Sequence, residues 1–343
     1  MQRSLVGSEM CIRDSMYTVV NIPLASILPT LTDDMNERTV LATWRKFFAF
    51  MGSTIVSATA LYLVKIVGNG NEAVGFRVVM GIFGVAGCVC FLLTFALVRE
   101  NNLSQTEKSA TLKETIQSAA HNTPWKLFAL NILFMWTGYF IQSSALVYYY
   151  KYYVESAKMA TMVATVMTMV PLVANLTVPF LAKRFGKRNL YSVSAGLQLA
   201  GLAVIFIGTV NTSVILAGAV ISAAGYGCKE SIYFSMQADP VDYGEWKTGI
   251  QATGTLSAIN GFLGKVAQAA AGGISGLLLS WGAYDADAVH QTANALTAIK
   301  MMYIYIPALL IICSIITMSF YHLDKEFPQI QKELEERRKV QNK

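Results

Sequence analysis

Long apolar runs alternate with shorter polar stretches along the chain, and this alternation predicts its secondary structure. Beyond residue 15 the apolar runs cover residues 16–31, 46–67, 74–98, 125–150, 159–182, 189–209, 213–237, 252–281 and 298–321. All but the first reach about 20 residues, the length that a helix needs to cross a bilayer at about 1.5 Å per residue. The runs are continuous and lack a period of two, which favours helices over a β-barrel. The pattern predicts an all-α polytopic membrane protein with nine transmembrane helices.

Composition agrees with this fold class and narrows the function. Of the 343 residues, 54% are hydrophobic and 14% are charged, whereas soluble domains carry about 25% charged residues. The basic residues are scattered between the apolar runs, which argues against nucleic acid as a partner. The histidines His121, His290 and His322 fall in polar stretches or at the end of a run, and no nucleophile and base stand at a recognisable spacing. The chain is therefore predicted not to be an enzyme, and to use no cofactor and no metal.

The lysines and arginines of the polar stretches predict the orientation in the membrane. One set of alternate loops, with residues 32–46, 99–126, 183–188, 238–251 and the tail 322–343, contains 18 of the 27 basic residues. The other set contains 5, namely Lys65, Arg77, Lys151, Lys158 and Lys300. Because cytoplasmic loops are enriched in Lys and Arg, the first set and the C-terminus are predicted to be cytoplasmic.

The beginning of the chain predicts a piece of a larger protein. Residues 1–15 resemble a leader that recurs before unrelated reading frames as an assembly artefact, and they lack the apolar run of a signal peptide. Nine spans are an awkward count for a two-bundle transporter, whereas about three more upstream would give twelve. The expected divisions are a partial N-terminal bundle at 16–98, a cytoplasmic middle loop at 99–124, a C-terminal six-helix bundle at 125–321 and a cytoplasmic tail at 322–343.

Three charged residues stand in the interior of predicted spans, away from the ends of the apolar runs. Lys265 lies about 14 residues into its apolar run, or about 20 Å along it, so its ammonium group stands near the membrane midplane. Charge at that depth is costly and commonly functional, so we expect Lys265 to face a polar cavity or a partner. Lys229 and Glu230 lie nearer the cytoplasmic end of the preceding run. Adjacent residues face different neighbours on a helix, and either structural pairing or a place on the substrate path would explain them.

Other polar residues at the helix faces and ends are candidate substrate contacts. Tyr17, Thr18 and Asn21 share one face of the first run because they are three and four residues apart. A hydrogen bond between helices is the alternative explanation for them. Arg45 opens the second run, where the enrichment of cytoplasmic helix ends in basic residues also explains it.

Proline and glycine predict two features of helix packing. Pro171, Asn175 and Pro179 lie within one run and predict a broken or bent helix. Glycines surround Lys265 in the run 252–281 and predict a close approach of helices there, at positions Gly264, Gly272, Gly273 and Gly276.

The polar segment QADPVDYGEWKTG is the most distinctive of the chain. It carries Asp239, Asp242 and Glu245 at three-residue spacing, on the side of the membrane where Lys and Arg dominate. A metal site is an alternative, but no histidine accompanies the carboxylates and Lys247 follows closely. We therefore expect gating salt bridges to loops of the other bundle, which break and reform as a transporter rocks.

Several segments together resemble the glycoside-pentoside-hexuronide:cation symporter family of the major facilitator superfamily. The resemblance covers residues 16–325, and it is carried by Tyr17–Pro23 with Leu28-Pro29-Thr30, by Arg45–Phe48, by Lys183–Lys187, by Asp239–Gly249 and by Lys265. It implies the major facilitator fold with nine of twelve helices present, the first run being the fourth helix of the family. It also implies that Asn21 and Arg45 contact sugar, that Thr18 lies near the cation, and that Lys265 is essential. Asn21 departs from the family pattern, where an aspartate stands.

The resemblance implies a monomeric, cation-coupled sugar symporter in the bacterial inner membrane, working by alternating access. Its coupling ion, Na⁺ or H⁺, stays open because the family's main cation ligands lie on a second helix that is not in this sequence. Within or beside the spans, three basic residues stand against one acidic residue: Arg45, Lys229 and Lys265 against Glu230. If these side chains share one cavity, their excess of positive charge favours a hexuronide over a neutral disaccharide. The alternatives are a lipid or drug carrier of the same fold, and an inactive fragment.

Overall fold

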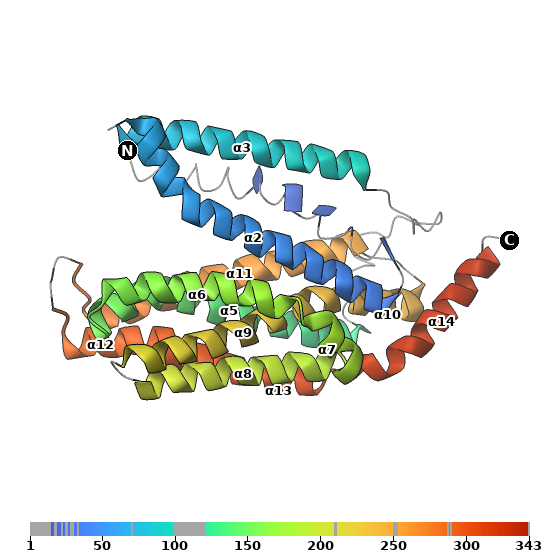
Figure 1. Cartoon of the computed structure of the whole chain (residues 1–343). Coiled ribbons are helices and arrows are strands. Elements are labelled where there is room, and N and C mark those ends of the chain that lie inside the picture. Colours follow the sequence, from blue (N-terminus) through green and yellow to red (C-terminus); the bar gives the residue numbers. More distant parts are fainter. Residues whose placement is uncertain are drawn as a thin grey trace.

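The computed structural model describes residues 15, 16, 19–21, 23, 24, 27, 31, 32, 34–69, 71–98, 121–208, 211–249, 253–286, 288 and 290–341. Within these residues the secondary structure is helical, with no strand (Figure 1). Seven helical segments are long and apolar enough to cross a membrane: Ala73–Leu97, Thr123–Tyr153, Lys158–Asn175, Lys187–Gly208, Thr212–Thr248, Thr255–Trp281 and Ala293–Ser319. Each coincides with a predicted span. Of the other two predicted spans, 46–67 falls within a long helix and 16–31 lies mostly outside the described residues, so the count of nine stays a prediction.

Two helices form a layer of their own. Helix α2 (Met35–Gly68) and helix α3 (Glu72–Leu97) are joined by a tight turn in which Asn71 caps α3 by accepting a hydrogen bond from the backbone of Val74. Gly68 and Gly75 pack backbone to backbone there, because a Cβ atom on Gly75 would stand 2.3 Å from the Val64 carbonyl oxygen. Figure 1 shows α3 lying apart from the remaining helices.

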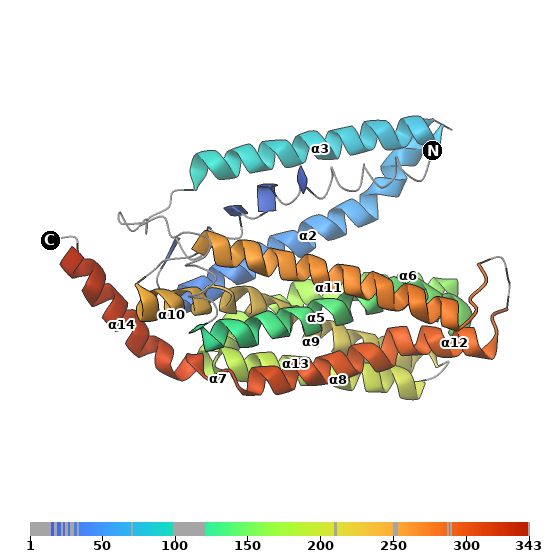
Figure 2. The ribbon, with the colours of Figure 1, turned by 180° about the vertical axis from the view of Figure 1, so that it is seen from behind.

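The remaining helices form one bundle. They are α5 (Thr123–Tyr148), η1 (Tyr149–Tyr153), α6 (Ala157–Asn175), α7 (Val178–Phe185), α8 (Lys187–Gly208), α9 (Thr212–Met236), α10 (Asp239–Thr248), α11 (Thr253–Trp281), α12 (Ala293–Lys300), η2 (Met301–Tyr305) and α13 (Ile306–Ser319). Figure 2 shows α11 along one edge of this bundle and α14 (Leu323–Gln341) leaving it obliquely beyond α13. The predicted break is confirmed: α6 ends at Asn175, and α7 begins with Pro179 in its first turn, where the missing N–H costs nothing.

Helix α9 is fixed in the bundle by close backbone packing. A Cβ atom on Gly225 would stand 2.4 Å from the Gln198 nitrogen of α8, and one on Gly201 would stand 2.3 Å from the Ser222 nitrogen of α9. A Cβ atom on Gly227 would stand 2.6 Å from the Cα atom of Pro171 on α6. Because only glycine permits these distances, α9 keeps one position relative to α6 and α8.

The predicted close approach of α11 through its glycines is not found among the described residues. A Cβ atom built on Gly264, Gly272, Gly273 or Gly276 meets no atom of the described residues within 4 Å. Gly272, Gly273 and Gly276 are exposed and Gly264 is half-buried, and the close backbone approaches fall between α8, α9 and α6 instead.

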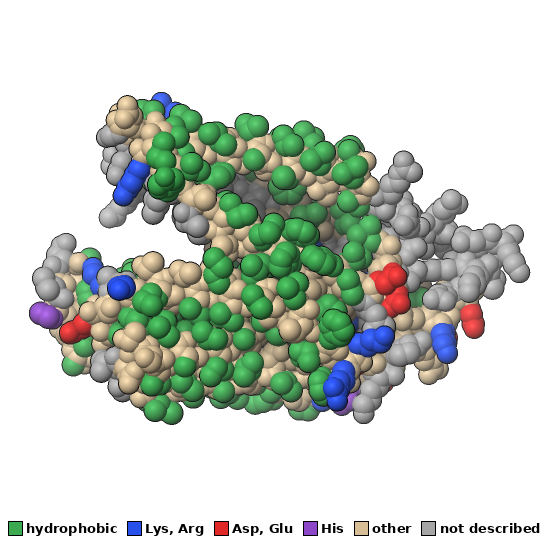
Figure 3. All heavy atoms as spheres, viewed as in Figure 1, with side chains coloured by type: hydrophobic (Ala, Val, Ile, Leu, Met, Phe, Trp, Pro, Cys, Tyr) green, Lys and Arg blue, Asp and Glu red, His purple; other side chains and the backbone are tan. Residues whose placement is uncertain are grey.

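Helix α2 leans across the bundle and meets it at one end only. Its N-terminal half contacts α6, α7, α9 and α10, while its C-terminal half diverges toward α3 (Figure 1). Figure 3 shows the resulting gap between the α2–α3 layer and the bundle, widest at the end where α12 lies. We call the two ends the α10 end, which is closed by α2, and the α12 end, where the gap lies.

Candidate functional site

The contact between α2 and the bundle is a row of polar pairs. The row begins at the α10 end with the ion pair of Arg38 and Asp242, and it ends with the ion pair of Lys46 and Glu230. Between them lie two pairs of hydroxyl groups: Thr39 and Ser235 at 2.8 Å, and Thr43 and Ser231 at 3.3 Å. Thr39, Thr43 and Lys46 recur at spacings of four and three, which places them on one face of α2, and Arg38 directly precedes Thr39. We call these eight residues the α2 seam. Its hydroxyl-bearing side chains are at most 3% exposed, so the seam is a closed contact.

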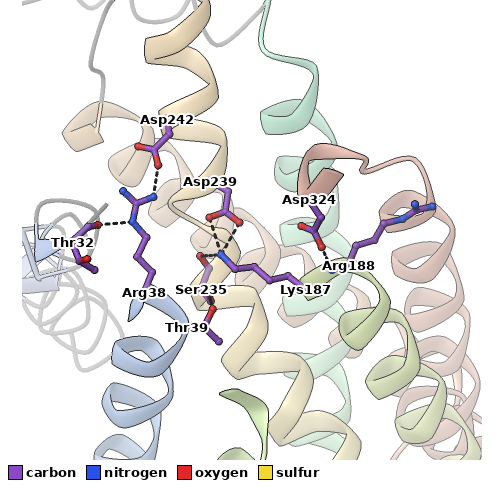
Figure 4. Close-up of polar contacts among 9 residues, drawn as sticks. All are labelled: Thr32, Arg38, Thr39, Lys187, Arg188, Ser235, Asp239, Asp242 and Asp324. Atoms are coloured by element: carbon purple, nitrogen blue, oxygen red, sulfur yellow. Dashed lines mark hydrogen bonds and ion pairs between the residues drawn. The ribbon is translucent and has the colours of Figure 1, made fainter. Parts of the chain in front are cut away.

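Arg38 and Asp242 close the α10 end. The guanidinium group donates from Nη1 to Asp242 Oδ2 and from Nε to the Thr32 carbonyl oxygen at 2.8 Å (Figure 4). Arg38 is 1% exposed, and Asp242 lies in the first turn of α10, where the helix dipole favours a carboxylate. This pair joins α2 to the bundle; a gating role for Asp242 stays a prediction.

Lys46 and Glu230 are the last pair of the seam, counted from the α10 end. Lys46 Nζ lies 2.7 Å from Glu230 Oε1 and 3.7 Å from the centroid of the Phe234 ring. The side chains of Lys46 and Glu230 are 14% and 6% exposed. The Arg45 guanidinium carbon also lies near Phe234, 5.6 Å from the ring centroid. The lysine is therefore held by a carboxylate on one side and an aromatic face on the other.

Lys229 and Glu230 point to different neighbours, which confirms the sequence prediction. Lys229 Nζ donates to Gln198 Oε1 of α8 at 2.5 Å, inside the bundle, while Glu230 reaches across to α2. Both side chains are buried. Of the two, only Glu230 contributes to the contact between the layers.

Asp239 does not have the partner that the sequence predicted. Its two carboxylate oxygens each lie 2.9 Å from Lys187 Nζ, and both side chains are buried (Figure 4). Lys187 begins α8, so this pair joins two helices of the same bundle, whereas the prediction was a bridge to the other half. Asp239 and Asp242 share the first turn of α10, which lies between α8 and α2, so the first meets Lys187 while the second meets Arg38.

Helix α14 packs against the outer side of α10. Trp246 Nε1 donates to Glu333 Oε2 at 2.6 Å, and Arg337 Nη1 donates to the Trp246 carbonyl oxygen at 2.8 Å. The hydrogen bond from Trp246 lowers the pKa of the Glu333 carboxyl group. The apolar face of α14 is buried through Phe327, Ile330 and Leu334. Glu245, the third predicted gating carboxylate, is half-buried on α10. Among the residues that the structure describes, no group of three His, Cys, Asp or Glu side chains is arranged to hold a metal ion.

The other predicted site residues are spread over the molecule. Lys265 is half-buried at the thirteenth position of α11, outside the α2 seam. Asn21 is half-buried in a helical stretch, and the predictions for Tyr17 and Thr18 lie outside the described residues. The structure thus brings together Arg45 and Glu230 around Phe234, and it leaves the roles of the others as predictions.

Sequence reasoning missed Lys46 in favour of its neighbour Arg45. The signal was present, because Thr39, Thr43 and Lys46 form a polar stripe at spacings of four and three in a helix that is otherwise rich in apolar residues. The matching serines Ser231 and Ser235 on α9 carry the same four-residue spacing. Two complementary stripes of this kind predict a polar contact between two helices.

Comparison with known proteins gives a consistent set of similarities. The profile of the family described as "MFS/sugar transport protein" matches residues 5–325. The isoprimeverose transporter of Lactiplantibacillus pentosus is 34% identical over 334 residues, which span 96% of this chain and 69% of the relative. The glucuronide carrier protein homolog of Escherichia coli is 26% identical, over 95% of this chain and 71% of the relative.

A solved structure supports the fold. The crystal structure of the Escherichia coli fucose:proton symporter superposes with a TM-score of 0.64 at 15% sequence identity, covering 88% of this chain and 73% of the symporter. At that identity the likeness shows the architecture alone, which is the helical fold of the major facilitator superfamily.

Proposed function

Since the chain belongs to the MFS/sugar transport protein family, and is accordingly a multi-pass membrane transporter and not an enzyme, we propose that it carries a sugar or glycoside by symport with a cation. The observation that carries the proposal is the α2 seam, a polar contact that closes one end of the molecule beside a gap at the other. Alternating access requires two layers that separate at one end while they meet at the other. A seam made of hydrogen bonds and ion pairs suits that task, since water replaces such contacts when they separate.

The charge pattern of the loops supports an orientation for this cycle. With the basic loop set in the cytoplasm, the α10 end and the C-terminus are cytoplasmic, and the gap at the α12 end opens to the outside. The arrangement then corresponds to the state that receives substrate from the outside. We place the protein in the bacterial inner membrane as a monomer.

The foot of the gap is where we place the sugar. Lys46, Glu230 and Phe234 offer a donor, an acceptor and an aromatic face at the point where α2 leaves the bundle. Glu230 pairs with Lys46, and Lys229 donates to Gln198 inside the bundle, so Lys229 does not add its charge to this place. Since a relative with 34% identity is an isoprimeverose transporter, an uncharged sugar is the first to test, ahead of a hexuronide. Asn21, Arg45 and Lys265 remain proposed sugar contacts, and Tyr17 and Thr18 keep their proposed roles toward sugar and cation.

The experiment is uptake of labelled sugar by cells that express the protein. Isoprimeverose, which is uncharged, and a glucuronide, which is an anion, are offered with and without Na⁺ and with and without a protonophore. We expect accumulation of isoprimeverose above its external concentration, and its loss when the driving gradient is removed. Lys46→Met is expected to lower uptake at least tenfold, while Gly276→Ala, at an open position on α11, serves as the matched control. Failure to accumulate either sugar would overturn the proposal.

A further inference from the structure

The short helix α7 presents two kinds of side chain on its outer face. Val178 and Ala182, four residues apart, form its buried face. Lys183 and Arg184 stand three and four residues after Phe180, so these three side chains share the opposite face. All three are exposed, and Phe180 is 84% exposed. The outer face of α7 is therefore apolar near its beginning and basic at its end.

The two basic residues of α7 have no acidic partner in the described part of the protein. Neither Lys183 nor Arg184 takes part in any of its ion pairs. The guanidinium carbon of Arg184 lies 5.5 Å from the centroid of the Phe185 ring, the side chain next to it. An aromatic face holds a guanidinium group in place without neutralising it. Both charges therefore stay available to a partner outside the protein.

The two basic residues that follow α7 are bound within the protein instead. Lys187 is buried and paired with Asp239. Arg188 donates from its side chain to two carbonyl oxygens at the end of α13, and its backbone N–H donates to Asp324 Oδ2 at 2.7 Å. Four basic residues of the segment 183–188 thus stand beside two carboxylates. The surplus of two positive charges lies at the end of α7.

The order of apolar and basic side chains on α7 matches the order of the parts of a phospholipid. The apolar run that contains Phe180 ends at residue 182, and Lys183 and Arg184 follow directly. Arg184 lies about 6 Å beyond Phe180 along the helix axis at about 1.5 Å per residue. Figure 1 shows α7 at the α10 end, and Figure 3 shows Lys and Arg side chains gathered there beside a flank of hydrophobic side chains. This arrangement places a ring beside acyl chains and two cations beside headgroups.

We propose that the outer face of α7 binds an anionic phospholipid, whose phosphate group lies against Lys183 and Arg184 and whose acyl chain lies along Phe180. A soluble phosphate gains nothing from an exposed phenyl ring, whereas a lipid uses both halves of the face. A basic residue near an anionic membrane surface contributes about fivefold to binding. A lipid with a choline group offers the same phosphate together with a cation, which the two basic residues repel. This inference concerns the membrane around the transporter and goes beyond the proposed symport.

The test is lipid binding to the purified full chain in detergent, followed by native mass spectrometry. The probes are phosphatidylglycerol and phosphatidylcholine with the same acyl chains. We expect the wild type to bind phosphatidylglycerol at least tenfold more tightly, and the double variant Lys183→Gln/Arg184→Gln to lose this preference. The matched control is Lys65→Gln/Lys158→Gln, which removes the same charge from two exposed lysines at the other end of the molecule and should keep the preference.

Each remaining outcome of the binding experiment overturns the inference. A wild type that binds the two lipids equally has no such site. A control variant that loses the preference as fully as the α7 variant shows that total charge decides, and not the end of α7. Glycerol phosphate, which has the phosphate without acyl chains, should not displace phosphatidylglycerol even in large excess. Displacement would make this a site for a soluble anion.

A second measurement reports on the α7 face alone. Phe180→Trp keeps an aromatic ring at this position and adds a fluorophore to the five tryptophans of the chain. In bilayers, its additional fluorescence should be half-quenched at a mole fraction of dibrominated phosphatidylglycerol at least threefold below that of dibrominated phosphatidylcholine. With Lys183→Gln/Arg184→Gln in the same chain, the two lipids should quench alike. Equal quenching by both lipids in Phe180→Trp itself overturns the inference.

Discussion

Helix α9 has two faces that are packed in opposite ways. Toward α8 it presents Gly218 and Gly225, which lie so close to the α8 backbone that a Cβ atom would stand under 3.0 Å from it. Toward α2 it presents Ser231, Ser235 and the carboxylate of Glu230. The first face brings backbone against backbone at these glycines, and the second meets α2 through polar side chains.

The difference separates a permanent contact from an exchangeable one. Backbone packing through glycine has no substitute in water or lipid, so separating α8 from α9 would leave a void. A hydrogen bond between hydroxyl groups contributes only about 0.5–1.5 kcal/mol net, because water offers equivalent partners. The α8–α9 contact therefore fixes the frame, and the α2 seam is the part of the molecule able to open.

The largest difference between the permanent and the exchangeable contact should appear when one buried carboxylate is removed from each of them. Asp242→Asn removes the carboxylate that Arg38 contacts across the seam, and Asp239→Asn removes the carboxylate that Lys187 contacts within the bundle. Breaking such pairs costs about 3–5 kcal/mol. In Asp242→Asn we expect the seam to open, measured as faster maleimide labelling of Ser235→Cys. In Asp239→Asn we expect a lower melting temperature in detergent and unchanged labelling.

Equal labelling of Ser235→Cys in the two aspartate variants would remove the distinction. It would mean that the Lys187 pair also takes part in opening, and that α8 and α10 move relative to one another.

The second largest effect is expected from a methyl group added to the face of α9 that carries Gly218 and Gly225. Gly225→Ala forces a Cβ atom to 2.4 Å from the Gln198 nitrogen and 2.6 Å from the Ser194 carbonyl oxygen. Overpacking of this kind costs about 1–3 kcal/mol. We expect a melting temperature several degrees lower, measured by thermal unfolding in detergent. Gly276→Ala, where the Cβ atom meets no described atom within 4 Å, should melt like the wild type.

Substitutions at the Thr39–Ser235 hydroxyl pair of the seam should have a smaller effect, and the single and the double variant should differ in a way that identifies its cause. Thr39→Val leaves the Ser235 hydroxyl buried without its partner at 2.8 Å, whereas the double variant Thr39→Val/Ser235→Ala removes both groups. An orphaned hydroxyl costs more than the absence of both, so the single variant should favour the open seam by about 1 kcal/mol and the double variant by less. Maleimide labelling of Ser231→Cys, at another buried position of the seam, measures the open fraction. A double variant that opens more than the single one would contradict this account.

The sequence predicted the helices well and the contacts between them only in part. Apolar runs of about 20 residues determine where spans lie, because a span must satisfy its own backbone in lipid. The break after Asn175 followed from Pro179, whose ring cannot enter a helix interior. The divergence of Lys229 and Glu230 followed from helical geometry. These features depend on local chemistry, which a single sequence contains.

The predictions that failed concern features that depend on how each helix is rotated about its axis. Arg45 and Lys46 differ by one residue, or about 100° on the helix, and the rotation of α2 decides which of them meets Glu230. The partner of Asp239 depends on the place of α10 between α8 and α2, and the exposure of the α11 glycines depends on which helices surround α11. Rotation is determined by the packing of the whole bundle, so no single segment contains it.

Weakening the contact between α10 and α14 should have the smallest effect, and this effect should depend most on pH. Trp246 donates to the Glu333 carboxylate, and this hydrogen bond lowers the pKa of that group. A lowered pKa in the folded state stabilises the docked helix above the unfolded pKa, and the stabilisation is lost as the pH falls through the folded pKa. We expect faster hydrogen exchange of α14 at pH 3 than at pH 7 after correction for the intrinsic rate, and no such pH dependence in Glu333→Gln.

Because α14 holds α10 from its outer side while Asp242 holds α2 from the other, the Glu333 variant should leave the labelling of the α2 seam unchanged. Faster labelling would make α14 part of the exchangeable contact instead of the frame.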